Sequence, residues 1–240
     1  MPWYVNNTLL VLLFVVQHSV GTTAAAKRLT AKMVGNRPYL WNAVYNIFTV
    51  AVIVVMVLYW KSSGVVIWNL SQPWFGILLG VEAVMLFIFF YLFKYTQPFG
   101  EWIGYKQVWR MVRREAEPSG EGYKIKTHGI KRYIRFPHHT VLFIMAWSMP
   151  YMTADLLLLS ISTSVYLWLG SVHQDYRGRT YFREQWWEYS KNTRMLFPSI
   201  EHVIYNLEES REARAEQAAS APGAAGPVAH VPEAAQTSHR

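Results

Sequence analysis

Imidazole, amide and carboxyl groups recur where three apolar segments of this sequence begin or end. The residues at these positions are Gln17, His18, His138, His139, His173, Gln174 and Asp175. An imidazole titrates near neutral pH, so it can take a proton from a substrate or bind a metal. An ionisable group inside a membrane segment costs about 3 kcal/mol, which makes such a group a functional candidate by default.

The same residues also have a structural interpretation. His18 can hydrogen-bond within a helix bundle or extend to the membrane interface. Pro137 before the two histidines is an ordinary residue for the first turn of a helix. The basic residues Lys131, Arg132 and Arg135 can contact anionic lipid headgroups. The residue types alone leave both interpretations open.

Five apolar segments separate these polar positions. Of the 240 residues, 52% are hydrophobic and 16% aromatic. About 20 apolar residues cross a bilayer as a helix, and Trp or Phe at both ends favours the interface. The segments are Tyr4 to Val20, Trp41 to Trp60, Trp74 to Phe93, Thr140 to Met149 and Asp155 to Gly170. The last two form a hairpin around Pro150. The sequence therefore predicts an all-α polytopic membrane bundle of about five transmembrane helices.

Lysine and arginine are concentrated in the first and third connections between these segments. The positive-inside rule then places the N-terminus outside and the C-terminus in the cytoplasm, which we interpret as a multi-pass protein of a bacterial inner membrane. Topology also explains the net charge of +8, and no motif indicates a nucleic-acid partner. The absence of cysteine excludes disulfides, thiolate metal sites and a cysteine nucleophile.

An aromatic, charged segment follows the fifth apolar segment. Phe182, Trp186 and Tyr189 recur at spacings of four and three, which predicts an amphipathic helix on the cytoplasmic surface. Pro198 then ends this part of the chain. Residues 207–240 are rich in Ala, Glu and Pro, and from Glu208 on valine is the only large apolar residue. They are therefore predicted to be a disordered tail after a membrane domain of residues 1–206.

Several short motifs resemble one known family in their order and spacing. They are residues 15–20 (VVQHSV), 66–68 (VIW), 104–109 (GYKQVW), 127–137 (THGIKRYIRFP) and 195–198 (MLFP). The chain resembles membrane methyltransferases related to isoprenylcysteine carboxyl methyltransferase. It is most similar to the bacterial methanethiol S-methyltransferases and also shares features with the NnrU proteins. The resemblance runs from about Leu10 to Pro198.

This resemblance implies a helical methyltransferase that binds S-adenosylmethionine at its cytoplasmic face. The methyl acceptor it implies is a small thiol or a lipophilic substrate reached from the membrane. The cofactor-binding residues that it implies are His128, Gly129, Tyr133, Arg135, Pro137, Gln174, Asp175 and Tyr189. His18 and His139 are the candidate catalytic bases, and no metal ligand is implied.

Two departures from the family pattern keep other functions open. Phe136 stands where the family has histidine, and Gln174 with Asp175 replaces a pair of glutamates. A family member that kept the fold as an accessory subunit of a larger membrane complex is a second hypothesis. A third is that His18, His138, His139 and His173 bind a haem or metal ion.

Overall fold

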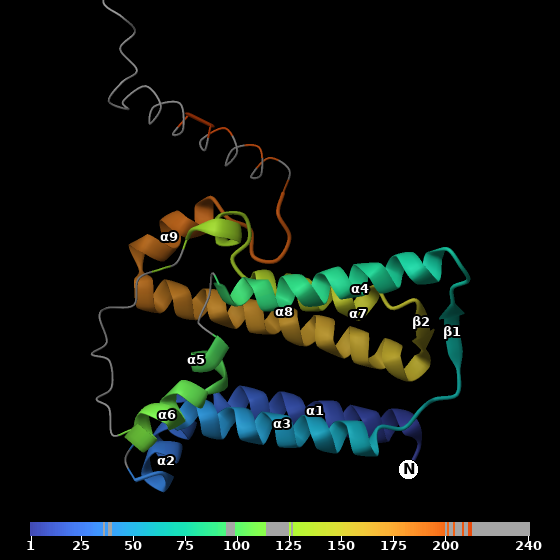
Figure 1. Ribbon diagram of the computed structural model, residues 1–240, viewed down its shortest axis with the longest axis horizontal. Coiled ribbons are helices and arrows are strands. Elements are labelled where there is room, and N and C mark those ends of the chain that lie inside the picture. The colour runs from blue at the N-terminus through green and yellow to red at the C-terminus, as the bar shows by residue number, and fades with distance from the viewer. Residues whose placement is uncertain are drawn as a thin grey trace, which may run out of the picture. The chain divides into compact units, whose positions relative to one another are not determined.

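The computed structural model is a bundle of long helices (Figure 1). It describes residues 1–35, 37, 40–94, 99–113, 125, 127–199, 201, 204, 208, 211 and 212. The named elements lie in the first of two units, Met1–Pro198, and the second unit is Ser199–Arg240. The tail predicted to be disordered, residues 207–240, falls almost entirely outside the described residues.

The elements alternate long helices with short connecting pieces. The helices of the first half are α1 (Trp3–Gly21), α2 (Ala24–Met33), α3 (Trp41–Tyr59), α4 (Trp74–Tyr91), α5 (Phe99–Ile103) and α6 (Tyr105–Arg113). Those of the second half are α7 (Pro137–Trp147), α8 (Ala154–Phe182) and α9 (Glu184–Lys191). The other named elements are two 3₁₀ turns, η2 (Leu92–Lys94) and η3 (Gly129–Arg132), and two strands, β1 (Val66–Asn69) and β2 (Tyr151–Thr153).

Among the described residues, four helices are long and apolar enough to cross a membrane. They are α1, α3, α4 with its η2 extension, and α8. Their apolar side chains are mostly exposed, as with Val57 at 72% and Phe87 at 70%, because lipid rather than protein is their surrounding. This confirms the predicted helical membrane bundle. The fourth predicted segment is the 11-residue helix α7, about 16 Å long, which packs between α4 and α8.

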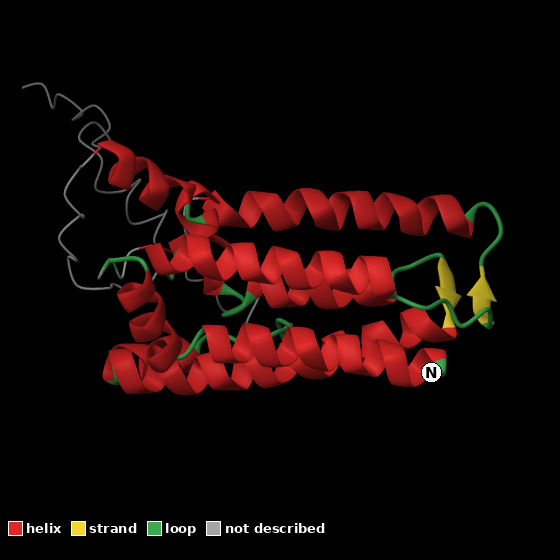
Figure 2. Ribbon diagram, turned by 90° about the horizontal axis from the view of Figure 1, so that it is seen from below, coloured by secondary structure: helices red, strands yellow, loops and turns green. Residues whose placement is uncertain are grey.

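Helix α8 is longer than its apolar segment. It continues without a break through Ser171 to Phe182, so the first part of the predicted amphipathic helix is the end of α8. Arg183 then takes a left-handed backbone conformation, with φ at 47°, and α9 starts in a new direction. The long helices run side by side, and the two strands lie together at one end of the bundle, here called the sheet end (Figure 2). The opposite end, where α7 begins and α8 ends, is called the site end.

A buried carboxylate holds the sheet end together. β1 pairs antiparallel with β2, a contact that joins the connection after α3 to the start of α8. Asp155, 4% exposed, accepts hydrogen bonds from Trp60 Nε1 at 3.0 Å and from the Ser63 backbone N–H and hydroxyl at 2.9 and 2.7 Å. The Thr153 hydroxyl caps the same helix by accepting from the Leu156 N–H.

We expect Asp155→Ala to lower the free energy of unfolding by about 2 kcal/mol, because it leaves buried donors without their acceptor. Ser62→Ala, next to the partner Ser63, is the control and should change stability little. Denaturant unfolding of both variants in detergent measures the difference. Equal stability of the two variants would show that water replaces the carboxylate at no cost.

Candidate functional site

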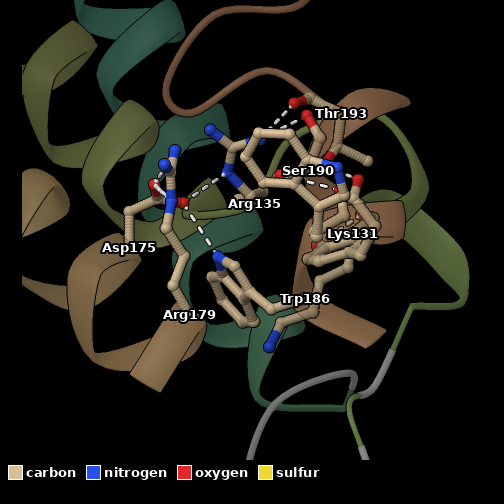
Figure 3. Close-up of polar contacts among 9 residues, drawn as sticks. Lys131, Arg135, Asp175, Arg179, Trp186, Ser190 and Thr193 are labelled. Atoms are coloured by element: carbon tan, nitrogen blue, oxygen red, sulfur yellow. Dashed lines mark hydrogen bonds and ion pairs between the residues drawn. The ribbon is translucent and has the colours of Figure 1, made fainter. Parts of the chain in front are cut away.

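Arg135 and Asp175 form a buried ion pair at the site end (Figure 3). Arg135 Nε lies 3.1 Å from Asp175 Oδ1, and each side chain is 10% exposed. The guanidinium Nη1 donates to the backbone carbonyls of Ser190, at 2.9 Å, and Thr193. Three chain segments therefore meet at one arginine: the residues before α7, the end of α8, and the turn after α9.

Backbone pairing fixes the position of Arg135. Its N–H donates to the Arg194 carbonyl at 2.9 Å, and the next N–H, of Phe136, donates to Met195 at 3.2 Å. The Thr140 hydroxyl donates to the Leu196 carbonyl one turn into α7. The segment after α9 thus runs beside the start of α7 and holds it in place.

Asp175 binds two further groups besides Arg135. Its Oδ1 accepts from Trp186 Nε1 at 3.0 Å, and its Oδ2 accepts from Arg179 Nε at 3.0 Å. Arg179 is 52% exposed, whereas Trp186 is buried. Gly178 makes room for the indole, since a Cβ on this glycine would lie 2.3 Å from the Trp186 ring. The glycine in the middle of a helix is therefore explained by close packing of α9 on α8.

Tyr189 closes the cluster from α9. Its hydroxyl donates to the Lys131 carbonyl at 2.7 Å, and its ring meets Trp186 edge to face at a centroid distance of 5.5 Å. Burial raises the pKa of Tyr189 to about 12, although the nearby Arg135 charge works in the opposite direction. Burial likewise lowers the pKa of Arg135, and the Asp175 carboxylate opposes that change.

The raised pKa of Tyr189 predicts a loss of stability in alkali. Its contribution is fully present below the unfolded-state pKa of about 10 and is lost as the pH rises toward about 12. Between these two pH values, the free energy of unfolding of Tyr189→Phe should fall by about 2–3 kcal/mol less than that of the parent protein. Denaturant unfolding at a series of pH values measures the two slopes. Parallel curves for parent and variant would contradict the prediction.

A chain of hydrogen bonds adjoins the ion pair on α7 and α8. His139 Nδ1 lies 2.7 Å from the Ser171 hydroxyl, which donates to the Leu167 carbonyl at 2.8 Å. The hydrogen bond from Ser171 to Leu167 favours an imidazole hydrogen on Nδ1, and Nε2 lies 3.4 Å from Gln174 Nε2. The centroid of the Phe136 ring lies 5.7 Å from that of His139 and 6.4 Å from that of Trp186. Phe136 therefore lies between the His139 hydrogen bonds and the Arg135–Asp175 cluster.

His18 belongs to a different cluster. Its Nδ1 lies 2.6 Å from the Tyr45 hydroxyl on α3, and its ring packs against Phe14 and Tyr166. The Ser19 hydroxyl lies 3.3 Å from that of Tyr166. The structure therefore places the two predicted bases in separate hydrogen-bond networks. The network of His18 lies between α1, α3 and α8, and that of His139 lies between α7 and α8.

The other predicted residues shape the approach to α7. His128 precedes η3, Gly129 takes a positive φ of 67° that favours glycine, and Tyr133 ends the turn. Pro137 is the first residue of α7, as expected. His138 lies against the rings of Phe89 and Phe93 on the α4 side. Within the described ranges, no three His, Cys, Asp or Glu side chains gather closely enough to hold a metal ion.

Two residues of the site were missed by sequence reasoning. Arg179 follows Asp175 by four residues, the helical spacing that brings opposite charges together, and this signal was available. Ser171 carries no signal of its own, because a serine four residues after Leu167 is unremarkable until His139 is placed beside it.

The sequence of the chain is similar to those of known proteins. The chain is 25% identical over 193 residues to methanethiol S-methyltransferase 1 of Bradyrhizobium diazoefficiens, covering 80% of this chain and 66% of that protein. It is 30% identical over 192 residues to nurim of Rattus norvegicus, covering 73% and 68%. It is 25% identical over 204 residues to methanethiol S-methyltransferase of Pseudomonas deceptionensis, covering 81% and 72%. The chain thus matches about two thirds of the length of these relatives.

No family model and no solved structure matches the chain. The bundle defines a multi-pass membrane protein, and its sequence relatives indicate a methyltransferase-like family. The chain belongs to the membrane family that includes nurim and the methanethiol S-methyltransferases, which agrees with the resemblance in its motifs.

Proposed function

We propose that this protein is a membrane methyltransferase that uses S-adenosylmethionine to methylate a small thiol or a lipophilic substrate. The observation that supports this most is the pairing of Arg135 with Asp175. These two residues, which the family resemblance assigns to one cofactor site, come from the segment before α7 and from α8, and they meet in space. The names of the related methyltransferases support the same class of reaction.

The cluster offers complementary charges to the amino-acid end of such a cofactor. The described contacts of Arg135 use Nε and Nη1, so Nη2 is the atom proposed to bind a carboxylate. Asp175 Oδ2 is proposed to bind an ammonium in place of Arg179, whose half-exposed side chain can move at little cost. Trp186 and Tyr189 are buried and hydrogen-bonded, so their role is to hold these charges in position.

His139 is proposed as the base. S-adenosylmethionine, when bound, would supply the activated methyl group for the acceptor thiol. The thiol proton is proposed to pass to Nε2 of His139, whose other ring nitrogen, Nδ1, lies 2.7 Å from the Ser171 hydroxyl. The protein otherwise aligns the reactants and excludes water. His18 belongs to a separate network and is the second candidate for this role.

An apolar groove supports a lipophilic acceptor. A cavity of about 540 Å³ opens beside α7 and α8, lined mainly by Phe143, Val165, Trp168, Leu196 and Phe197. Its lining also includes Arg194, whose carbonyl accepts from the Arg135 N–H. A substrate in this groove is therefore adjacent to the segment that positions the proposed cofactor site.

Orientation is part of the proposal. The distribution of lysine and arginine supports a site end that faces the cytoplasm, where the cofactor is available, with the N-terminus outside a bacterial inner membrane.

The purified protein should bind S-adenosylhomocysteine in a calorimetric titration. A second function, a scaffold subunit of a larger membrane complex, is favoured by the fact that the charges of Arg135 and Asp175 already neutralise each other. A titration without heat of binding, on protein shown to be folded, would reject the methyltransferase and support the scaffold.

A further inference from the structure

Helix α6 carries an apolar face and a basic stripe, neither of which the site uses. Tyr105, Val108, Trp109 and Val112 recur at helical spacing and are 39–68% exposed. The basic stripe beside them consists of Lys106, Arg110 and Arg113. A helix with large apolar and cationic faces lies in the interface of a membrane, with its apolar face in the acyl boundary.

The position of α6 in the fold is fixed. Gly104, at φ 93°, brings the junction of α5 and α6 so close to α3 that a Cβ would lie 2.5 Å from the Ala43 backbone. Asn46 Nδ2 donates to the carbonyls of Trp102 and Ile103 at 2.7 and 3.1 Å, and Asn42 Nδ2 donates to Glu101 at 3.3 Å. These contacts hold α5 and its junction with α6 against the first turns of α3, where that membrane-spanning helix begins.

An apolar groove follows the contact between α3 and α6. It has a volume of about 370 Å³ and is lined by Ala43, Asn46, Ile47, Val50, Ile103, Gly104, Tyr105 and Val108. The groove runs along the lipid-facing side of α3, since Ile47 and Val50 are 68% and 58% exposed. An acyl chain fits this surface because it is apolar, open and parallel to a membrane-spanning helix.

The charges beside the groove select the headgroup. Glu101 and Arg110 form an ion pair at 2.9 Å and compensate each other. Lys106 and Arg113 add positive charge on the same stripe, and the Arg113 guanidinium lies 4.6 Å from the centroid of the Trp109 ring. Helix α2, which also packs on α3, contributes Lys27, Arg28 and Lys32. An anionic headgroup is complementary to this surface.

We propose that α3, α5 and α6 form a binding site for an anionic phospholipid, with its headgroup at Lys106 and Arg113 and an acyl chain in the groove beside Ile47 and Val50. This site is separate from the Arg135 cluster and does not depend on the proposed methyl transfer. Lipid binding at this site would explain why α6 is amphipathic and why its start is held against the first turns of α3.

Native mass spectrometry of the full chain in detergent, titrated with phosphatidylglycerol or phosphatidylcholine, tests the proposal. The parent protein should retain phosphatidylglycerol more tightly. Each charge near a membrane surface contributes about fivefold in affinity, so Lys106→Gln with Arg113→Gln should weaken phosphatidylglycerol binding by about 25-fold. Arg177→Gln with Lys191→Gln removes the same charge from α8 and α9 and should leave binding unchanged.

A neutral variant keeps the test independent of charge. Ile47→Phe fills the groove and should reduce retention of phosphatidylglycerol at least fivefold, with an unchanged apparent unfolding temperature. Equal retention of the two lipids by the parent would overturn the proposal. So would equal weakening by the two charge-removing pairs, or full retention by Ile47→Phe.

Discussion

Asp175→Asn should be among the most destabilising single substitutions in this protein, at about 3–5 kcal/mol. The carboxylate neutralises Arg135 in a site where both side chains are 10% exposed, and it accepts from Trp186 Nε1. Removing one partner of a buried ion pair leaves the other charge without compensation, which costs more than the pair contributes. Denaturant unfolding in detergent, followed by tryptophan fluorescence, measures the loss.

Arg179→Gln is the matched control. Arg179 contacts the same carboxylate, at 2.9 Å from Oδ2, but its side chain is 52% exposed. Water can replace it, so we expect a change below about 1 kcal/mol. If the free energy of unfolding falls by the same small amount in both variants, water reaches Asp175, and the cluster does not stabilise the site end.

The membrane spans were predictable because an uninterrupted apolar length is a local property of the sequence. The segments predicted at Trp41 to Trp60 and Trp74 to Phe93 are observed as Trp41–Tyr59 and Trp74–Tyr91 with its 3₁₀ extension. The end of α8 was harder to predict, because hydropathy falls after Gly170 while the helix does not end. A helix satisfies its own backbone hydrogen bonds, so it continues from lipid into polar surroundings without a break.

Contacts between residues far apart in the chain could not be predicted from the sequence. Arg135 and Asp175 were both assigned to a cofactor, and nothing in either residue type shows that they would pair with each other. The contact of β1 with β2 joins strands too short to give a period-two pattern. The contact of Arg179 with Asp175, by contrast, follows from their helical spacing in the sequence.

Arg135→Lys should weaken binding of S-adenosylhomocysteine by about ten- to a hundredfold, or about 1.5–3 kcal/mol. An ammonium keeps the charge but cannot bond two carbonyls, approach Asp175 and bind a ligand carboxylate at the same time, as a planar guanidinium can. Lys131→Ala removes a positive charge four residues earlier and should leave the dissociation constant unchanged. Calorimetric titration of each variant gives the comparison.

Reduced stability of Arg135→Lys must be separated from reduced binding. Asp155→Ala is the matched control, because it destabilises the bundle from the sheet end, far from the proposed cofactor site, through the loss of bonds to Trp60 and Ser63. We expect this variant to bind S-adenosylhomocysteine as tightly as the parent at a temperature where both remain folded. Weaker binding by Asp155→Ala would attribute the effect of Arg135→Lys to stability. Equal weakening by Lys131→Ala would mean that a diffuse basic surface, not a defined site at Arg135, attracts the ligand.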